Sequence, residues 1–541
     1  MPNHRRLLPL IAFLLLLPAQ APAQVPTPGT VQETLKPPVA PPREAPLPEI
    51  KTPPPAKPAA PADERRVKVE RFAISGNTLF SEDELRKVIA SWEGKELTLT
   101  DIYQVADQLT DFYQEHGYSL TTVTVPAQKM QAGAIRLEVV EGRVGKFIFN
   151  GNQRYRDQFL TRQLDQVKPG TIVKFKDLER EILLLNDLPG LVARSVLEPG
   201  EAYGTTDLIL NIEETRATAQ ATFDNHGPKV VGQWRAGADF NINNPFKFGD
   251  TLSLGYTHTE SGLLRQGRIS YGFPVHRSGT KLKLSYNRAD YDVGGEFSAL
   301  GIDGTSETAR IEATQPLIKS RRTNLTWMVG GAHVKGQSDL SGIPLSDDEI
   351  SYLETGLDFG QRHGDGAITT LSALFATNFR DNSNGDRNNA LPPRLELKGG
   401  YEYPFRQNWS AALRGEAVLS TDPMPDSNMY SIGGPTSVRA FVSSRLRGDQ
   451  GALASLELRR FIDLEKVDLQ LRGFVDAGLV DSHATAGAPG DSESLTGAGL
   501  GLSAMFADYF TLEMLWAKPL DGKESGENRD SRFWFTLNAG F

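Results

Sequence analysis

The sequence predicts two small α+β modules followed by a transmembrane antiparallel β-barrel of about sixteen strands. Residues 67–142 and 143–215 repeat one order of strands and helices, and after residue 215 the helical patterns stop. Beyond the N-terminus no apolar run approaches the roughly 18 residues that a membrane-spanning helix needs. In lipid, a closed barrel is then the remaining way to pair every backbone polar group.

Composition narrows the functional classes. The chain has 541 residues, 58 basic and 67 acidic, and therefore a net charge of -9. This balance does not provide the basic surface that nucleic-acid binding requires, so no nucleic-acid partner is expected. Cysteine is absent, which excludes disulfide frameworks, thiolate metal sites and cysteine nucleophiles.

The N-terminal segment predicts export. Residues 4–6 are basic or histidine, an apolar run covers 7–17, and Ala21-Pro22-Ala23 provides the small residues of a cleavage site. This pattern indicates a secretory signal peptide over residues 1–23. Residues 24–66 follow, with 13 prolines between Gln24 and Pro61. Such a segment is expected to be an extended, solvated spacer.

The first module reads as strand, helix, helix, strand, strand. A capping box at Ser81–Glu84 opens the first helix, and Thr100 or Asp101 is expected to cap the second, which ends at Gly117. The module's strands are expected at 69–74, 120–125 and 134–140.

The second module repeats this order. Phe147–Asn152 restates Phe72–Asn77 at a spacing of 75 residues (151 minus 76). Helical patterns at 156–167 and 175–188 and strands at 192–197 and 207–213 follow. A repeat of this length indicates two copies of one module.

The remaining residues, 216–541, alternate apolar and polar side chains in segments of about ten residues separated by Gly, Asn, Asp and Pro clusters. This is the pattern of a membrane barrel. A soluble sandwich or propeller would explain any single segment, but it explains the last strand less well. There the alternating apolar residues end on the final one: Phe533, Phe535, Leu537, Ala539 and Phe541.

Two motifs in the barrel point to a family. Gly433-Gly434-Pro435-Thr436-Ser437-Val438-Arg439-Ala440-Phe441 precedes Phe474-Val475-Asp476-Ala477-Gly478 by about thirty-five residues, so one carboxylate is offered to one arginine. Together these stretches resemble the paired signatures of the Omp85 superfamily. More narrowly, the chain resembles the two-partner secretion transporters of the ShlB/FhaC/HecB haemolysin secretion/activation family. Further motifs with this resemblance are Phe223–Gly227, Asn244–Leu252 and Tyr271–Val275.

The resemblance implies a specific organisation. Residues 67–142 and 143–215 would be POTRA domains in the periplasm, and 216–541 a barrel in the outer membrane of a Gram-negative bacterium. Residues 421–450 would fold into the lumen, with Arg439 bonded to Asp476. The implied lumen motif is Val438, Arg439, Ala440 and Phe441; the implied anchoring motif is Phe474, Asp476 and Gly478; and Phe541 would be the barrel-assembly signal.

The chain departs from the family pattern at the loop tip and in the N-terminal spacer. Ala440 stands where the family usually has glycine and takes positive φ less readily, so we expect Gly433 and Gly434 to supply the freedom. Relatives also carry an N-terminal helix that plugs the barrel. In this proline-rich spacer only Val31–Leu35 has room for a helical turn, so we expect no comparable plug.

The implied function is secretion of an unfolded exoprotein, with outer-membrane lipid as surroundings and with periplasmic chaperones and the barrel-assembly machinery as partners during biogenesis. Exposed sheet edges bind extended chains by strand addition. The expected capture edges are 120–125 and 192–197, with side chains Leu120, Val123, Val125, Val192, Val196 and Leu197.

Two alternatives remain. One is an Omp85-type barrel-assembly factor, although such factors usually carry three or more POTRA domains and this chain has room for two. The other is a barrel enzyme. No H-E-x-x-H, G-x-S-x-G or Walker pattern occurs, so no catalytic, cofactor or metal site is expected.

Overall fold

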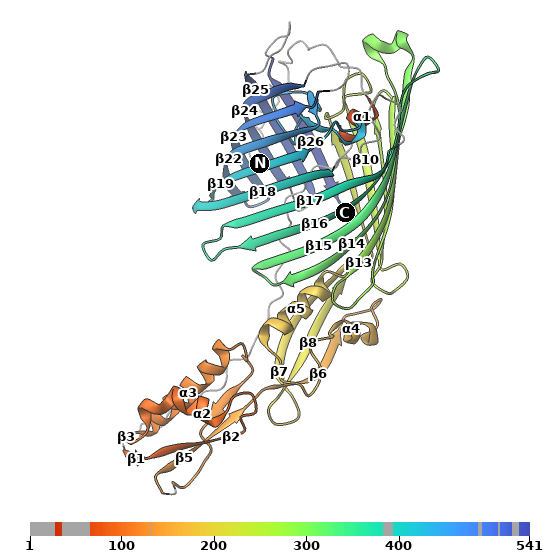
Figure 1. Cartoon of the computed structure of the whole chain (residues 1–541). Helices are drawn as coiled ribbons and strands as arrows, with labels where there is room; N and C mark the ends of the chain where they lie inside the picture. The colour runs from red at the N-terminus through yellow and green to blue at the C-terminus, as the bar shows by residue number, and fades with distance from the viewer. Residues whose placement is uncertain are drawn as a thin grey trace, which may run out of the picture.

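Two α/β modules extend from one end of a large barrel in the computed structural model (Figure 1). The structure describes residues 27–34, 65–130, 132–381, 393–484, 490–506, 509–521 and 530–541. The expected signal peptide and most of the expected spacer lie outside these residues. The predicted fold class, two α+β modules followed by a sixteen-strand barrel, is confirmed.

The first module packs two helices on a three-stranded sheet of order β2-β5-β4, in which β2 and β5 are parallel. Ser81 caps α2 with a capping box. The cap of α3 differs from the expectation at Thr100 or Asp101. Thr98 accepts a hydrogen bond from the Asp101 backbone, and the Asp101 side chain accepts one in return. The elements are β1 (Val67–Val69), β2 (Arg71–Ser75), α2 (Glu82–Ile89), η2 (Ala90–Trp92), β3 (Lys95–Leu97), α3 (Leu99–Glu115), β4 (Thr122–Thr124) and β5 (Ala134–Val140).

The second module repeats the arrangement with sheet order β6-β8-β7. Its core forms between this sheet and α5, whose buried face includes Leu178, Ile182 and Leu185. The elements are β6 (Arg143–Asn150), α4 (Asp157–Gln163), α5 (Phe175–Asn186), β7 (Leu191–Pro199) and β8 (Thr205–Glu214).

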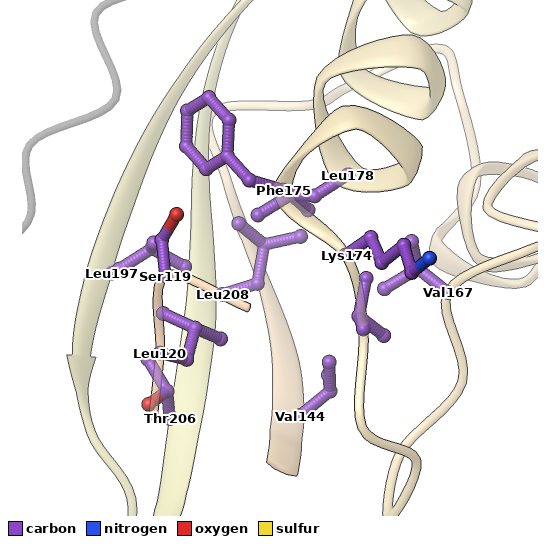
Figure 2. A pocket seen from close by; sticks show the side chains of 11 residues that line it. Ser119, Leu120, Val144, Val167, Lys174, Phe175, Leu178, Leu197, Thr206 and Leu208 are labelled. Carbon is purple, nitrogen blue, oxygen red and sulfur yellow. The ribbon is translucent and has the colours of Figure 1, made fainter. Parts of the chain in front are cut away.

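Leu120 joins the two modules. Its side chain packs against the core of the second module, among residues that include Phe175, Leu178 and Leu208 (Figure 2). The backbone N–H of Phe175 donates to Gly117 O at 2.9 Å. The expected strand 120–125 is therefore shortened to Thr122–Thr124, because Leu120 leaves the sheet to bury apolar surface at the junction.

The barrel is a closed sheet in which neighbouring strands are antiparallel throughout. β26 pairs with β9, so the sheet closes, and the order is sequential except where the inward segment 421–449 interrupts it between β19 and β22. The strands are β9 (Ala217–Asp224), β10 (Arg235–Asn243), β11 (Thr251–Thr259), β12 (Leu264–Pro274), β13 (Lys281–Asp292), β14 (Ile302–Lys319), β15 (Thr323–Leu340), β16 (Ile343–Arg362), β17 (Ile368–Asp381), β18 (Pro393–Arg406), β19 (Trp409–Ser420), β22 (Gln450–Leu464), β23 (Val467–Ser482), β24 (Asp491–Phe506), β25 (Phe510–Asp521) and β26 (Arg532–Gly540), with a 3-10 turn η3 (Gly295–Leu300) before β14.

Alternation assigns the two faces of the wall. On β22, Leu456 and Leu458 are exposed on the outside, whereas Ser455 and Glu457 between and beside them are buried toward the lumen. This is the period-two pattern that the sequence predicts. Among the described residues, no helix is long and apolar enough to cross a membrane.

The second module is docked on the barrel through the short turns at the module end. Arg154 Nη2 donates to Asn244 O at 2.7 Å, Lys281 Nζ donates to Asp187 O at 2.7 Å, and Lys319 Nζ lies 2.8 Å from an Asp187 oxygen. These contacts join the module to the ends of β10, β13 and β14. They hold it beneath one side of the barrel opening.

One expectation for the spacer is wrong. Residues Pro28–Thr34 form a helix, α1, that lies inside the barrel (Figure 1). Pro28 occupies its first position, where a missing N–H leaves no hydrogen bond unmade. Val31 is fully buried in an apolar cluster with wall residues such as Tyr291 and Ile302. Tertiary burial thus stabilises a helix that is too short to persist alone.

The inward loop as candidate functional site

The segment between β19 and β22 folds into the lumen and carries the 3-10 turn η4 (Asp426–Asn428) and a two-stranded ribbon, β20 (Tyr430–Ile432) with β21 (Leu446–Gly448). We call residues 421–449 the inward loop. Asp449 closes its base, because its carboxylate accepts hydrogen bonds from the backbone N–H groups of Met424 and His483. The loop therefore begins and ends at one buried carboxylate.

Arg439 lies at the tip of the inward loop and is bonded to Asp476 on β23. Its Nε donates to Oδ2 at 2.8 Å and its Nη2 to Oδ1 at 2.6 Å. The backbone N–H of Arg439 also donates to Oδ2, at 3.1 Å. The side chains of Arg439 and Asp476 are 4% and 0% exposed, so water does not weaken the pair.

The remaining donors of Arg439 reach β22. Nη2 donates to Ser455 Oγ at 2.9 Å, and Nη1 donates to the carboxylate of Glu457. Ser455 Oγ in turn donates to Asp476 Oδ1 at 2.7 Å. One cation therefore faces two carboxylates and a hydroxyl, all on the inner wall.

Phe474 completes the surroundings of the guanidinium. Its ring centroid lies 3.5 Å from Arg439 Cζ, which is a cation–π stacking distance. Planar stacking and the side-on carboxylate pair both demand the fixed fork of arginine. A lysine at position 439 lacks that geometry.

Apolar neighbours fix the rest of the tip. Val438, Ala440 and Phe441 are buried in a cluster with wall residues that include Phe474 and Trp534. Glycines on the wall make room for them. A Cβ added at Gly478 would lie 3.0 Å from Val438 Cγ2, and one at Gly497 only 2.4 Å from Ala440 Cβ.

Ala440 keeps a negative φ, since it is absent from the described non-glycine residues with positive φ. The unusual backbone occurs upstream, where Gly433 and Gly434 both have φ of 105°. Each of them faces residues 442–445 so closely that a Cβ would clash. The tight turn into the tip thus needs these two glycines, and the tip itself accepts alanine.

The sequence motifs did not identify three further contacts. Glu457 is the second carboxylate of Arg439, and Trp534 Nε1 on β26 donates to Arg439 O at 2.7 Å. For the Glu457 contact, a signal was available in the sequence, namely the alternation of polar Ser455 and Glu457 along β22. For the Trp534 contact no signal was available in the sequence, because only barrel closure brings β26 to the loop.

The third contact joins the inward loop to α1. The Asp426 carboxylate accepts from Gly29 N at 2.9 Å and from Thr27 Oγ1 at 3.1 Å. Arg447 binds the same carboxylate and also donates to Thr27 Oγ1 at 3.1 Å. The helix inside the barrel is therefore held by the inward loop on one side and by the wall on the other.

The residues expected at capture edges differ in their burial. β4 and β7 are edge strands of their sheets, since the described residues pair β4 with β5 alone and β7 with β8 alone. Val192 and Val196 are half-buried on the uncovered face of their sheet, and Val125 packs partly against the first core. Val123 and Leu197 are buried in the cores, and Leu120 lies at the module junction.

Phe541 ends the chain beside the first barrel strand. Its backbone exchanges hydrogen bonds with Ala219, at 2.8 and 2.9 Å. The residue is 70% exposed, and its ring meets Phe510 edge-on with centroids 6.3 Å apart. Within the described ranges, no three His, Asp or Glu side chains gather as a metal site would require.

The comparisons with known proteins agree with this architecture. A family model described as haemolysin secretion/activation protein ShlB/FhaC/HecB matches residues 204–504. A model of the ShlB-type POTRA domain matches residues 67–142.

Curated relatives match along most of the chain. The heme/hemopexin transporter protein HuxB of Haemophilus influenzae strain 86-028NP is 23% identical over 475 residues, which cover 84% of this chain and 83% of HuxB. The outer membrane transporter CdiB of Dickeya dadantii is 24% identical and covers 72% of each chain. Among solved structures, CdiB from Escherichia coli superimposes with a TM-score of 0.74 at 20% identity, over 92% of this chain and 94% of that one.

Proposed function

We propose a transport mechanism from the premise that this chain belongs to the haemolysin secretion/activation protein family ShlB/FhaC/HecB. The protein is an outer-membrane transporter that moves an exoprotein through its β-barrel, with its modules in the periplasm. We propose that the exoprotein is of the haemolysin or adhesin type and arrives unfolded. The match of the family model over 204–504 is the observation that carries the function.

Capture takes place at the edges of the two module sheets. β4 and β7 each offer one unpaired side, and an extended chain that adds there gains main-chain hydrogen bonds with little demand on sequence. Most of the edge side chains are turned inward, which leaves the backbone as the recognised feature. The docking of the second module beneath the barrel opening supports β7 as the last site before entry.

The inward loop occupies one side of the lumen. Because Arg439 ties the tip to two strands at once, the loop lies against β22–β26 and leaves the opposite side of the lumen to α1. We propose that passage of the exoprotein requires α1 to leave, while the loop remains the fixed wall. No nucleotide motif occurs in the chain, so folding of the exoprotein outside the cell is proposed to supply the drive.

Two alternatives are less well supported. A barrel-assembly role would rest on a likeness to BamA of Haemophilus ducreyi, which superimposes with a TM-score of 0.55 at 16% identity and indicates the fold alone. An enzymatic role would need a catalytic group, and the sequence contains no H-E-x-x-H, G-x-S-x-G or Walker pattern that would indicate one.

A single-cysteine series tests capture directly, because the chain has no cysteine of its own. Arg194→Cys on the exposed edge β7 is expected to cross-link to a co-expressed exoprotein stalled during secretion. Lys176→Cys, exposed on helix α5, is the matched control and is expected to remain free. Equal labelling at both positions would refute edge capture but leave the transport function standing.

Secretion itself is tested by deleting residues 67–214. The shortened chain is expected to insert as a heat-modifiable barrel and to release no exoprotein into the medium. Release at the level of the parent would overturn the role of the modules.

A further inference from the structure

The seam between the last strand and the first is short at its cell-surface end. The ladder of β26 with β9 runs from Gly540–Gln220 to Thr536–Asp224 and stops there. On its other side β9 pairs with β10 from Ala217–Ile242 to Asp224–Arg235. β26 nevertheless continues outward through Phe535, Trp534 and Phe533 to Arg532.

The side chain of Asn225 takes over where the ladder ends. Its Nδ2 donates to Phe533 O at 2.9 Å, and its Oδ1 accepts from Phe535 N at 2.8 Å. The Asn225 backbone N–H also donates to Phe535 O at 3.3 Å. The primary amide therefore satisfies one carbonyl and one N–H of β26 that face the seam two residues apart, as one donor and one acceptor.

Buried contacts hold Asn225 in this place. The residue is 4% exposed. Asp224 before it is paired with Arg235 at 2.8 Å and accepts from the His226 backbone N–H. His226 Nε2 lies 3.1 Å from Thr536 Oγ1 on β26.

The inward loop contacts both sides of this closure. Ser443 Oγ donates to His226 O at 3.2 Å, next to Asn225 in the chain. On the other side of the seam, Trp534 donates to Arg439 O at 2.7 Å. The loop therefore bonds to both partners that Asn225 joins.

We propose that Asn225 is a positioning residue that closes the cell-surface end of the barrel seam, and that the inward loop holds this closure in register. Removing the amide weakens the bonding of β26 to β9 beyond Thr536, where β26 stays paired with β25, and displacing the loop tip loosens the same segment. The proposal concerns the seam alone and is independent of which exoprotein is transported.

Hydrogen exchange of the full-length protein in detergent tests the proposal at the bonds concerned. In Asn225→Ala, exchange of the peptide that contains 533–536 is expected to rise about tenfold, since two hydrogen bonds are lost. Exchange on β10 stays unchanged. Asn225→Asp, which keeps an acceptor for Phe535 N–H and loses the donor, is expected to lie between Asn225→Ala and the parent. Asn241→Ala is the matched control, because among the described residues its side-chain amide bonds only Thr218 Oγ1, in an exposed contact of 3.4 Å.

Coupling to the loop needs a second arm. Ser443→Ala is expected to raise exchange of the same peptide by a smaller factor, and Asn225→Ala/Ser443→Ala is expected to equal Asn225→Ala alone. If Asn225→Ala exchanges like the parent, the closure is refuted; if the two effects simply multiply, the coupling is refuted.

If Asn225→Ala inserts poorly, a disulfide across the seam allows the proposal to be tested by insertion instead. Thr222 and Asn538 are register partners with a side-chain bond of 2.9 Å. The pair Thr222→Cys/Asn538→Cys is expected to form a disulfide and to restore insertion of Asn225→Ala. Failure of the disulfide to restore it would show that Asn225 acts elsewhere, and would overturn the proposal.

Discussion

Arg439 and Asp476 meet side-on, with Nε and Nη2 of the guanidinium on separate oxygens of one carboxylate at 2.8 and 2.6 Å. The pair connects a loop tip to a strand 37 residues away in the chain. Burial makes the contact strong only while both partners are present, because an unpaired buried charge is costly. The barrel ladder does not depend on it.

Arg439→Ala and Asp476→Ala are each expected to insert normally and to secrete poorly. Loss of one partner costs about 3–5 kcal/mol locally, which displaces the loop while the paired strands persist. Secreted exoprotein at equal transporter abundance is the measurement. Arg288→Ala, at an exposed arginine on β13, is the control; if it impairs secretion equally, the loop has no special role.

The exchanged pair Arg439→Asp/Asp476→Arg is expected to recover little secretion. Glu457 lies against position 439, so the exchange places two carboxylates side by side and leaves them to repel each other. Adding Glu457→Gln to the exchanged pair is expected to improve recovery. Full recovery without that third change would mean that Glu457 does not face the loop tip.

Gly497→Ala is expected to displace the loop tip and reduce secretion, because the new methyl group would lie 2.4 Å from Ala440 Cβ. Ala440→Gly removes the opposing methyl group of Ala440 and so relieves the clash. The double variant Gly497→Ala/Ala440→Gly is therefore expected to regain most of the activity. Gly267→Ala on β12, where a Cβ meets nothing within 4 Å, is expected to be silent. Absence of rescue by Ala440→Gly would contradict the packing of the tip on β24.

Asp426→Ala is expected to release α1 from the inward loop, because this carboxylate bonds Thr27, Gly29 and Arg447. Single-channel conductance in a planar bilayer is then expected to rise. Asp422→Ala lies on the same loop, and among the described contacts its carboxylate bonds only the neighbouring Thr421 hydroxyl. This variant is expected to conduct like the parent. Unchanged conductance in Asp426→Ala would mean that the loop does not retain α1.

The second module is expected to lose stability as pH rises from about 5 to about 8. Burial raises the pKa of Glu181 on α5 from 4.5 to about 7. A carboxyl whose pKa is higher in the folded state favours folding at low pH, and that contribution disappears as pH rises through about 7. The effect is at most about 3 kcal/mol.

Calorimetry of the purified protein measures this change. Glu181→Gln is expected to raise the melting temperature of the module at pH 8 by several degrees and to leave it nearly unchanged at pH 5. Glu198→Gln, at an exposed carboxylate on β7, is the control. A shift of equal size at both pH values would rule out titration of Glu181 as the cause.

Patterns that repeat along the chain were readable from the sequence. Alternation at period two predicts the barrel because each strand faces lipid on one side and the lumen on the other, whatever its neighbours are. The repeated motif at Gly76 and Gly151 predicts two modules, because its geometry too is set by the local sequence. Both glycines have positive φ near 87° in the structure, each before a helix. Such local geometry recurs wherever the same short sequence recurs.

The tertiary structure decided which distant residues meet. Arg439 and Asp476 were paired from motifs, but Glu457 and Trp534 join them only once the sheet has closed and brought β22 and β26 to one loop. α1 forms because Val31 is buried in an apolar cluster with wall residues and because Asp426 accepts a hydrogen bond from the N-terminal turn of the helix. Asn225 bonds a strand 308 residues away. Closure of the barrel creates these neighbours, and no periodicity along the chain encodes the partner of a side chain across the seam.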